Sequence, residues 1–195
     1  ATSSSFDTVA SFVASGGQLA IDNVVARNNQ GMFLGGMGIS ALNGGHASLS
    51  QASITANLAD IGSGFVTGSG LVLTTDSNGS SIDVGNSVVW GNATDADSKD
   101  ISVSGPGIAL NRVHYGSLKG TPASNLSSST GDPRFVAPGD PHLRVDSPLR
   151  DSGIVGPVGG SGTWDIEGRS RVVGGAVDVG AYEWRDAIFA NGFDP

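Results

Sequence analysis

Cysteine is absent from this chain of 195 residues. Disulfide frameworks, zinc sites built on thiolates and thiol nucleophiles are therefore excluded together. Basic residues are scarce as well, because 10 Lys and Arg stand against 18 Asp and Glu and leave a formal net charge of −8. Since such a surface repels phosphate groups, the composition argues against nucleic acids and anionic membrane surfaces as partners.

Long apolar runs and helical periodicity are also missing. No stretch approaches the ~20 apolar residues that a membrane-spanning helix needs, so we expect no membrane span. The first residues, ATSSSFDTVA, lack the basic and apolar regions of a signal peptide. With 31 glycines and only 6% aromatic residues, the composition favours turn-rich β structure with little or no helix.

A phrase of eleven residues recurs along the first part of the chain. The clear copies are Leu19 to Asn29 (LAIDNVVARNN), Ala47 to Asn57 (ASLSQASITAN) and Ile82 to Asn92 (IDVGNSVVWGN), and Ile108 to Leu118 is a partial fourth. Their first residues lie 28, 35 and 26 positions apart. Such intervals are typical of solenoid repeats.

Each copy of the phrase is interpreted as a strand followed by a bend. Apolar residues at the first and third positions alternate with polar ones, which indicates a strand with one buried face. An amide stands at the fifth position, where Asn tolerates left-handed backbone geometry, and Asn returns at the eleventh. We expect stacked copies to align both sets into internal ladders, each amide bonding to the next. The two sets are Asn23, Gln51 and Asn86, and Asn29, Asn57 and Asn92.

The most specific motifs lie in the second half of the chain. They are NSVVWGN at 86–92, DPRFV at 132–136, HLRV at 142–145, SP at 147–148 and VDVGAYE at 177–183. In this order they resemble the C-terminal end of bacterial exported right-handed parallel β-helix proteins of the choice-of-anchor Q type. The resemblance implies a secreted or cell-surface bacterial protein, and it transfers no catalytic residue.

Repeat and resemblance together predict an all-β chain, a right-handed parallel β-helix (solenoid) with a C-terminal cap. The coils occupy 1–118, a Ser/Pro/Thr-rich linker 119–131, the capping segment 132–184 and an apolar tail 185–195. We expect the cap to cover the last apolar cross-section, with Trp164 and Trp184 packed inside it and an ion-pair cluster locking it. The covering residues are Phe135, Leu143, Val145 and Leu149, and the ion-pair cluster is Asp165, Glu167, Arg169 and Arg171.

Two kinds of ligand contact are predicted. Trp90 follows an inward position and so points outward, where an amphipathic ring suits carbohydrate or a protein partner. Asp95, Asp97 and Asp100 cluster in TDADSKD and are candidate calcium ligands, since hard cations need grouped oxygens. The alternative for these aspartates is a solvated loop that lengthens one coil. No other cofactor is expected.

The two ends of the solenoid are the predicted interfaces. Phe6 and Phe12 belong to a first coil that nothing upstream covers, and the tail carries Ile188, Phe189 and Phe193. An open coil exposes unpaired backbone groups, so we expect it to be covered by another copy of this chain or by the absent N-terminal part of a longer one.

The functional hypothesis is a non-enzymatic extracellular structural or adhesive protein that assembles head to tail into a filament. The alternative is a carbohydrate-binding or polysaccharide-lyase-like module, for which Arg112 and His114 share one strand face. A carboxylate pair for glycoside hydrolysis among the capping residues is a further alternative.

Overall fold

The computed structural model describes residues 8–31, 34–59, 69–92, 100–158, 160 and 162–186, with the side chains of Thr8 and Val9 left aside. Within these ranges the regular structure consists of β-strands without helices, and most strands pair in parallel. The predicted all-β class is therefore confirmed. No helix that is long and apolar enough to cross a membrane occurs in the described ranges.

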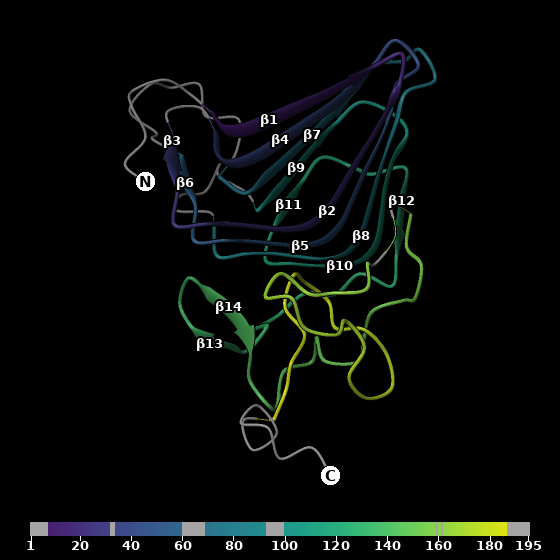
Figure 1. Cartoon of the computed structure of the whole chain (residues 1–195). Helices are drawn as coiled ribbons and strands as arrows, with labels where there is room; N and C mark the ends of the chain where they lie inside the picture. The colour runs from purple at the N-terminus through teal and green to yellow at the C-terminus, as the bar shows by residue number, and fades with distance from the viewer. Residues whose placement is uncertain are drawn as a thin grey trace.

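Two five-stranded parallel sheets form the first two thirds of the chain (Figure 1). The first has the order β1-β4-β7-β9-β11 and the second β12-β10-β8-β5-β2. The chain alternates between them, so each repeat gives one strand to each sheet. The first sheet comprises β1 (Thr8–Ser15), β4 (Leu34–Leu42), β7 (Leu71–Thr75), β9 (Ile101–Ser104) and β11 (Leu118–Lys119). The second comprises β2 (Gln18–Arg27), β5 (His46–Thr55), β8 (Ser81–Trp90), β10 (Ile108–Tyr115) and β12 (Ser124–Leu126).

The copies of the recurring phrase stack in the predicted register. Leu19 lies opposite Ala47, Ala47 opposite Ile82, and Ile82 opposite Ile108. The first and third positions point between the two sheets and form one apolar core with the inward residues of the first sheet. Short strands β3 (Gln30–Gly31) and β6 (Leu58–Ala59) form a further parallel pair.

The fifth position of each copy bends the strand. Asn23, Gln51, Asn86 and Arg112 all have a positive φ, between 45° and 60°. One left-handed residue interrupts the alternation of side chains, so the sixth and eighth positions point inward again. The seventh and ninth positions face away from the core, as Ser53 and Trp90 do.

The ladder predicted at the eleventh position is present. Asn29 Nδ2 donates to Asn57 Oδ1 at 2.8 Å, and Asn57 Nδ2 donates to Asn92 Oδ1 at 2.9 Å. Asp100 continues it, because its Oδ1 accepts from Asn92 Nδ2 at 3.0 Å. Each buried amide thus finds its partners in the neighbouring copy.

The ladder predicted at the fifth position is wrong in its main feature, because these side chains bind the C-terminal segment (residues 132–186). Asn86 exchanges two hydrogen bonds with the backbone of Ile154, at 2.7 and 2.9 Å. Asn23 Oδ1 accepts from the Arg171 guanidinium at 2.5 Å. The Gln51 side-chain amide donates to the carbonyl of Gly180 at 2.8 Å. Its oxygen accepts from Asn86 Nδ2 at 3.2 Å, and this bond is the part of the predicted ladder that is present.

The C-terminal segment lies along the outer side of the second sheet (Figure 1). It bonds to all four long strands of that sheet, through Asn23, Ser53, Asn86 and Arg112. Val88 packs outward against its apolar residues Leu143, Leu149 and Val179. The predicted cap therefore covers a flank of the strand stack, because the bend at the fifth position turns side chains toward that flank.

Several details of the predicted linker and cap differ. The hairpin β13 (Phe135–Ala137) and β14 (Asp140–Leu143) opens the C-terminal segment. Strand β12 falls inside the expected linker and pairs in parallel with β10, so it extends the stack. Val145 and Trp164 were expected to pack but are 65% and 59% exposed, whereas Trp184 does pack, beside Val88.

Buried carboxylates order the C-terminal segment, where regular strands are scarce. Glu183 accepts from the backbone amides of Val173 and Asp178 at 2.9 and 3.0 Å. Asp178 accepts from those of Asp151 and Trp184 at 2.7 and 2.6 Å. These groups take the place of a hydrogen-bond ladder, since buried backbone donors need acceptors. Burial raises the pKa of the Glu183 carboxyl to about 7 and also raises that of Asp178.

Candidate functional site

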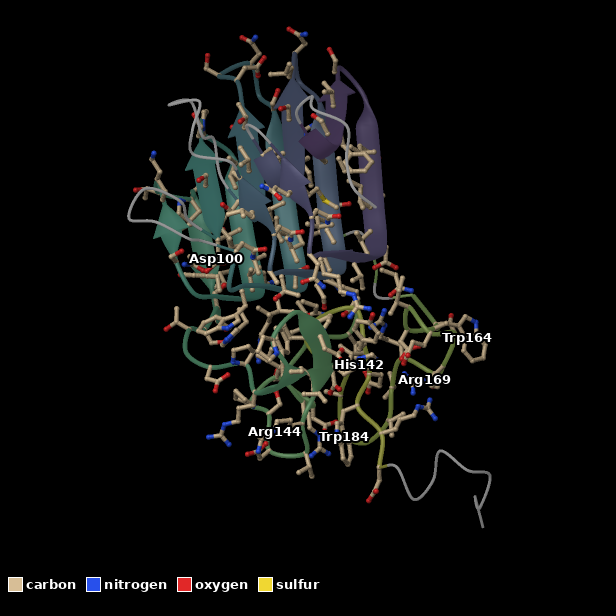
Figure 2. The ribbon with its side chains drawn as sticks, turned by 90° about the vertical axis from the view of Figure 1, so that its left-hand side faces the viewer. Asp100, His142, Arg144, Trp164, Arg169 and Trp184 are labelled. Atoms are coloured by element: carbon tan, nitrogen blue, oxygen red, sulfur yellow. The ribbon has the colours of Figure 1, made fainter. Side chains whose placement is uncertain are left out.

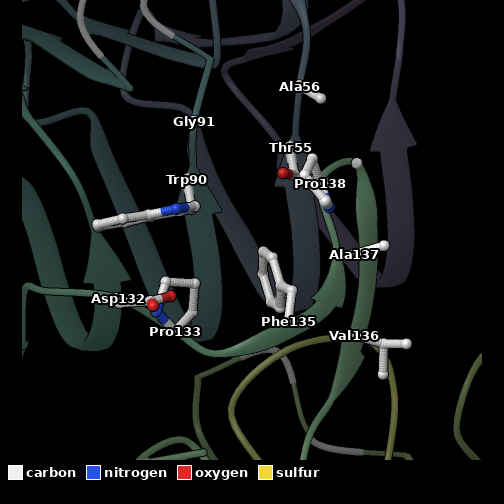
Figure 3. A pocket seen from close by; sticks show the side chains of 11 residues that line it. Thr55, Ala56, Trp90, Gly91, Asp132, Pro133, Phe135, Val136, Ala137 and Pro138 are labelled. Carbon is white, nitrogen blue, oxygen red and sulfur yellow. The ribbon is translucent and has the colours of Figure 1, made fainter.

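The candidate site is a groove between the ends of β5 and β8 and the β13–β14 hairpin. We call it the Trp90 groove (Figure 3), and its volume is about 310 Å³. Trp90 and Thr55 come from the strand ends, and the facing wall comes from the hairpin region. The lining residues are Thr55, Ala56, Trp90, Gly91, Asp132, Pro133, Phe135, Val136, Ala137, Pro138 and Gly139.

Trp90 occupies the groove because of its place in the repeat. It is the ninth residue of its copy, one position after inward Val89, and therefore points away from the core as predicted. The side chain is half-buried against the apolar cluster around Leu143 and Leu149. Its indole N–H has no acceptor among the residues that the structure describes, so within that part of the chain the polar edge of the ring is available to a ligand.

His114 supports the Trp90 ring from the neighbouring strand. The two ring centroids are 5.7 Å apart with planes tilted by 35°. Nε2 of His114 lies 2.9 Å from the carbonyl oxygen of Gly131, a pure acceptor, so Nε2 carries the proton. Nδ1 then accepts from the Ser129 hydroxyl at 2.8 Å. Burial lowers the pKa of His114, which keeps the ring neutral in this role.

Two oxygen groups complete the Trp90 groove. Asp132 Oδ1 accepts from the backbone amide of Arg134 at 2.8 Å, which fixes the carboxylate and leaves Oδ2 without a described partner. The Thr55 side chain contributes a hydroxyl on the opposite side (Figure 3). The remaining wall is apolar and includes Phe135. Aromatic surface with a few placed polar groups is the usual make-up of a small-ligand site.

A wider hollow in the C-terminal segment is lined by His142, Arg169 and Trp184. The side chains of His142 and Arg169 already bond to other residues of the protein. His142 Nδ1 lies 2.5 Å from Asp140 Oδ1, and Nε2 lies 3.2 Å from Glu167 Oε1. Arg169 pairs with Asp165 and Glu167, as the predicted ion-pair cluster requires, while Arg171 turns instead to Asn23 and Gly180. Figure 2 shows His142, Arg169 and Trp184 in this segment, well away from Asp100. We regard these contacts as structural, because the His142–Glu167 contact joins stretches that are 25 residues apart and Arg171 joins the segment to β2.

A Ser–His–Asp grouping on the second sheet does not form a hydrolytic site. His46 Nδ1 lies 2.8 Å from Ser81 Oγ, and Asp83 follows on the same strand face. The backbone amides of Ser81 and Ile82 donate to the carbonyls of Gly45 and Gly107, so neither remains for an oxyanion. The grouping is therefore an ordinary surface hydrogen bond beside a carboxylate.

The predicted calcium ligands are not assembled by the described residues. Asp95 and Asp97 lie outside the described ranges. Asp100 is buried, and its carboxylate already accepts from Asn92 and from the Ser117 hydroxyl. Among the residues that the structure describes, no three His, Asp or Glu side chains gather in a way that suits a metal ion.

Of the five predicted interface residues, the structure describes one. Phe12 lies on β1 and packs, half-buried, against the core between the sheets. The other four, Phe6, Ile188, Phe189 and Phe193, lie outside the described ranges.

The alternative catalytic residues have structural partners. Arg112 donates to the carbonyl of Ser152 at 2.8 Å, whereas His114 bonds to the carbonyl of Gly131. The two side chains therefore have different partners although both belong to β10. Asp165, one member of the carboxylate pair weighed for glycoside hydrolysis, accepts from the amides of Glu167 and Arg169. These bonds hold the C-terminal segment together.

Sequence reasoning identified Trp90 but missed its partners. Asp132 and Phe135 belong to the DPRFV motif, which was interpreted only as part of a cap, and Thr55 stands at the same repeat position as Trp90. That shared position was a usable signal for Thr55. Comparisons with protein-family models, with curated proteins and with solved structures found no match.

Proposed function

We propose that this chain is a non-enzymatic, secreted or cell-surface bacterial protein with a structural or adhesive role, built as a right-handed parallel β-helix, that binds carbohydrate in the Trp90 groove. The β-helix is supported by two parallel sheets between which the chain alternates, with repeats in constant register. Secretion is supported by the resemblance of the C-terminal motifs to exported β-helix proteins.

Carbohydrate binding is carried by one observation. Trp90 presents a ring face and an N–H with no described acceptor inside a groove that also holds Asp132 Oδ2, while the Thr55 hydroxyl belongs to a residue that is only 2% exposed. Sugars offer the matching chemistry, with C–H faces that pack on aromatic rings and hydroxyls that donate and accept. A non-enzymatic role is supported by the structural partners of Arg112 and Asp165, two of the residues considered for acid–base work.

Isothermal titration calorimetry against a panel of oligosaccharides tests the proposal. We expect at least one oligosaccharide to bind the intact chain, and Trp90→Ala to weaken that binding by at least ~10-fold, as loss of a central aromatic contact does. Trp164→Ala is the matched control and should leave the affinity unchanged, because Trp164 is exposed elsewhere in the C-terminal segment. Equal losses in both variants, or no binding to any saccharide, would contradict the proposal.

Self-assembly is a second candidate function, favoured by the edges of the two sheets. Strands β1 and β2 are the outermost strands at one end of the stack, and Phe12, Leu19 and Val24 lie there only partly buried. An edge strand offers unpaired backbone groups to a second copy, and head-to-tail contacts propagate into filaments. Negative-stain microscopy and light scattering at high concentration test it. Filaments or rings support assembly, and monodisperse monomers contradict it.

A further inference from the structure

We infer that the Trp90 groove selects short neutral saccharides and rejects acidic ones, with Asp132 as the residue that determines this specificity. The inference rests on the proposed function and names the ligand class for the same groove. It is drawn from the charges around the groove and from its two accessible polar groups, Asp132 Oδ2 and the Trp90 indole N–H.

The charge of the groove is the first argument. Asp132 is the ionisable residue among its lining side chains, and Lys, Arg and His are absent from that lining. The two nearest arginines pair with other carboxylates, since Arg134 pairs with Asp146 at 3.2 Å and Arg27 with Asp140 at 3.8 Å, although Arg27 also donates to the carbonyl of the lining residue Gly139 at 3.3 Å. A uronate or sulfate group would meet a carboxylate without a counter-ion, in a chain whose net charge is −8. Rejection of like charge is a standard source of specificity.

The free polar groups form a second argument, because they suit hydroxyls. Asp132 Oδ2 is an acceptor and the Trp90 indole N–H is a donor, whereas Thr55 is only 2% exposed and contributes little to the accessible polar surface. A hydroxyl bonded to a carboxylate makes a charge-assisted hydrogen bond, roughly twice as strong as a neutral one. The backbone bond from Arg134 to Asp132 Oδ1 holds Oδ2 in place before the ligand arrives, so little entropy is lost on binding.

The size of the Trp90 groove limits the length of the ligand. Its volume of about 310 Å³ stands at the low end of small-ligand pockets, which span ~300–1,000 Å³. Figure 3 shows the Phe135 ring between Trp90 and Pro133 on one side and Thr55 and Pro138 on the other. We therefore expect one end of a saccharide, or a short stretch of it, to be recognised.

Calorimetry with matched ligands tests the inference on the intact chain. Neutral cello-, xylo-, manno- and chito-oligosaccharides are compared with oligogalacturonate and oligoalginate of equal length. We expect binding only among the neutral set. Asp132→Asn keeps Oδ1 for the Arg134 amide but removes the charge, so neutral binding should weaken by ~10-fold or more while acidic binding becomes measurable. Asp83→Asn removes an equal charge on β8, outside the groove lining, and should change neither.

The outcomes separate this inference from the proposed function. Trp90-dependent binding of acidic saccharides by the intact chain would overturn the neutral specificity and leave carbohydrate binding in place. Neutral binding that is unchanged in Asp132→Asn would also overturn it, because the carboxylate would then have no role. Absence of binding to either set would contradict both. Circular dichroism of each variant identifies any loss of affinity that comes from misfolding.

Discussion

Single buried amides and carboxylates decide how the repeats of this chain stay joined. Asn57 is the clearest case, since its side chain bonds to Asn29 on one side and to Asn92 on the other. At the end of this row Asp100 supplies a carboxylate where the repeat no longer supplies an amide. Elsewhere Glu183 and Asp178 accept backbone amides of irregular stretches. In each case one polar side chain satisfies donors that strand pairing leaves over.

Replacing the middle of the Asn ladder should destabilise the whole stack. Asn57→Ala leaves the carbonyl of Ala26 and the amide of Asn29 without buried partners, and we expect a loss of ~2–4 kcal/mol in the free energy of unfolding. Urea denaturation measures it. Asn125→Ala is the control, because Asn125 is exposed and bonds only to the Tyr115 hydroxyl. Equal stability of Asn57→Ala and Asn125→Ala would contradict the ladder.

The contribution of Glu183 to the stability of the protein should fall as the pH rises from about 4.5 to 7, whereas that of His114, whose pKa is lowered by burial, changes in the opposite direction. Burial raises the pKa of Glu183 from 4.5 to about 7, so in this window the native state binds a proton that the unfolded state has released. Stability therefore decreases with pH, by at most ~3 kcal/mol from this group.

Urea midpoints at pH 5, 6, 7 and 8 provide the measurement for the Glu183 prediction. The midpoint of the intact chain relative to that of Glu183→Gln should fall as the pH rises, since the Gln amide does not titrate. Slopes that are identical in both proteins would refute the assignment to Glu183.

At the scale of the elements, each long strand of the second sheet works as two short ones joined at a left-handed residue. The bend lets β5 bury Leu49 before it and Ile54 after it, while Ser53 faces the C-terminal segment. The fifth position of the recurring phrase makes this left-handed bend in β2, β5, β8 and β10. Because parallel strands stack in register, one misplaced side chain acts on every neighbouring copy.

A charge placed at an inward position should prevent folding. Ile54→Asp puts a carboxylate at a site with no accessible surface and no cation among its core neighbours, and an unpaired buried charge costs several kcal/mol. Far-UV circular dichroism and thermal melting measure the effect. Ser104→Asp is the matched control on β9, where the side chain is exposed, and it should melt like the parent. A cooperative melt of Ile54→Asp at the parent temperature would refute the inward position.

The whole molecule consists of a strand stack and a C-terminal segment that is fastened along its flank. Arg171 is central to this fastening, since it is almost fully buried and donates to Asn23 Oδ1 and to the carbonyl of Gly180. The carboxylates of Asp165, Asp178 and Glu183 lie around it and stabilise its charge. The Trp90 groove exists only because this segment lies beside β5 and β8.

Loss of Arg171 should release the C-terminal segment before the stack unfolds. Arg171→Met leaves buried carboxylates without their cation, which costs roughly 3–5 kcal/mol. We expect limited proteolysis to cut within 132–186 while the β-sheet circular dichroism signal remains. Arg144→Met is the control, because Arg144 is a surface cation whose side chain is 58% exposed. Protection from protease equal to that of the parent would contradict the role of Arg171.

The sequence by itself determined the strands that carry the recurring phrase, their register and the Asn ladder. These follow from local alternation and from a repeat that brings equal residues together, as at Leu19, Ala47 and Ile82. It also determined that Trp90 points outward, because parity along one strand fixes that direction. Such features depend on neighbours in the chain or in the next repeat, and a periodic pattern records both.

Only the tertiary structure decided where the C-terminal segment lies and what surrounds Trp90. The segment has no period, and its fastening joins residues as distant as Asn23 and Arg171, 148 positions apart. The same amides that fitted an internal ladder, Asn23 and Asn86, found other partners because the left-handed bend turns them outward. Burial of one segment against another depends on shape and charge over the whole surface, which no local pattern encodes.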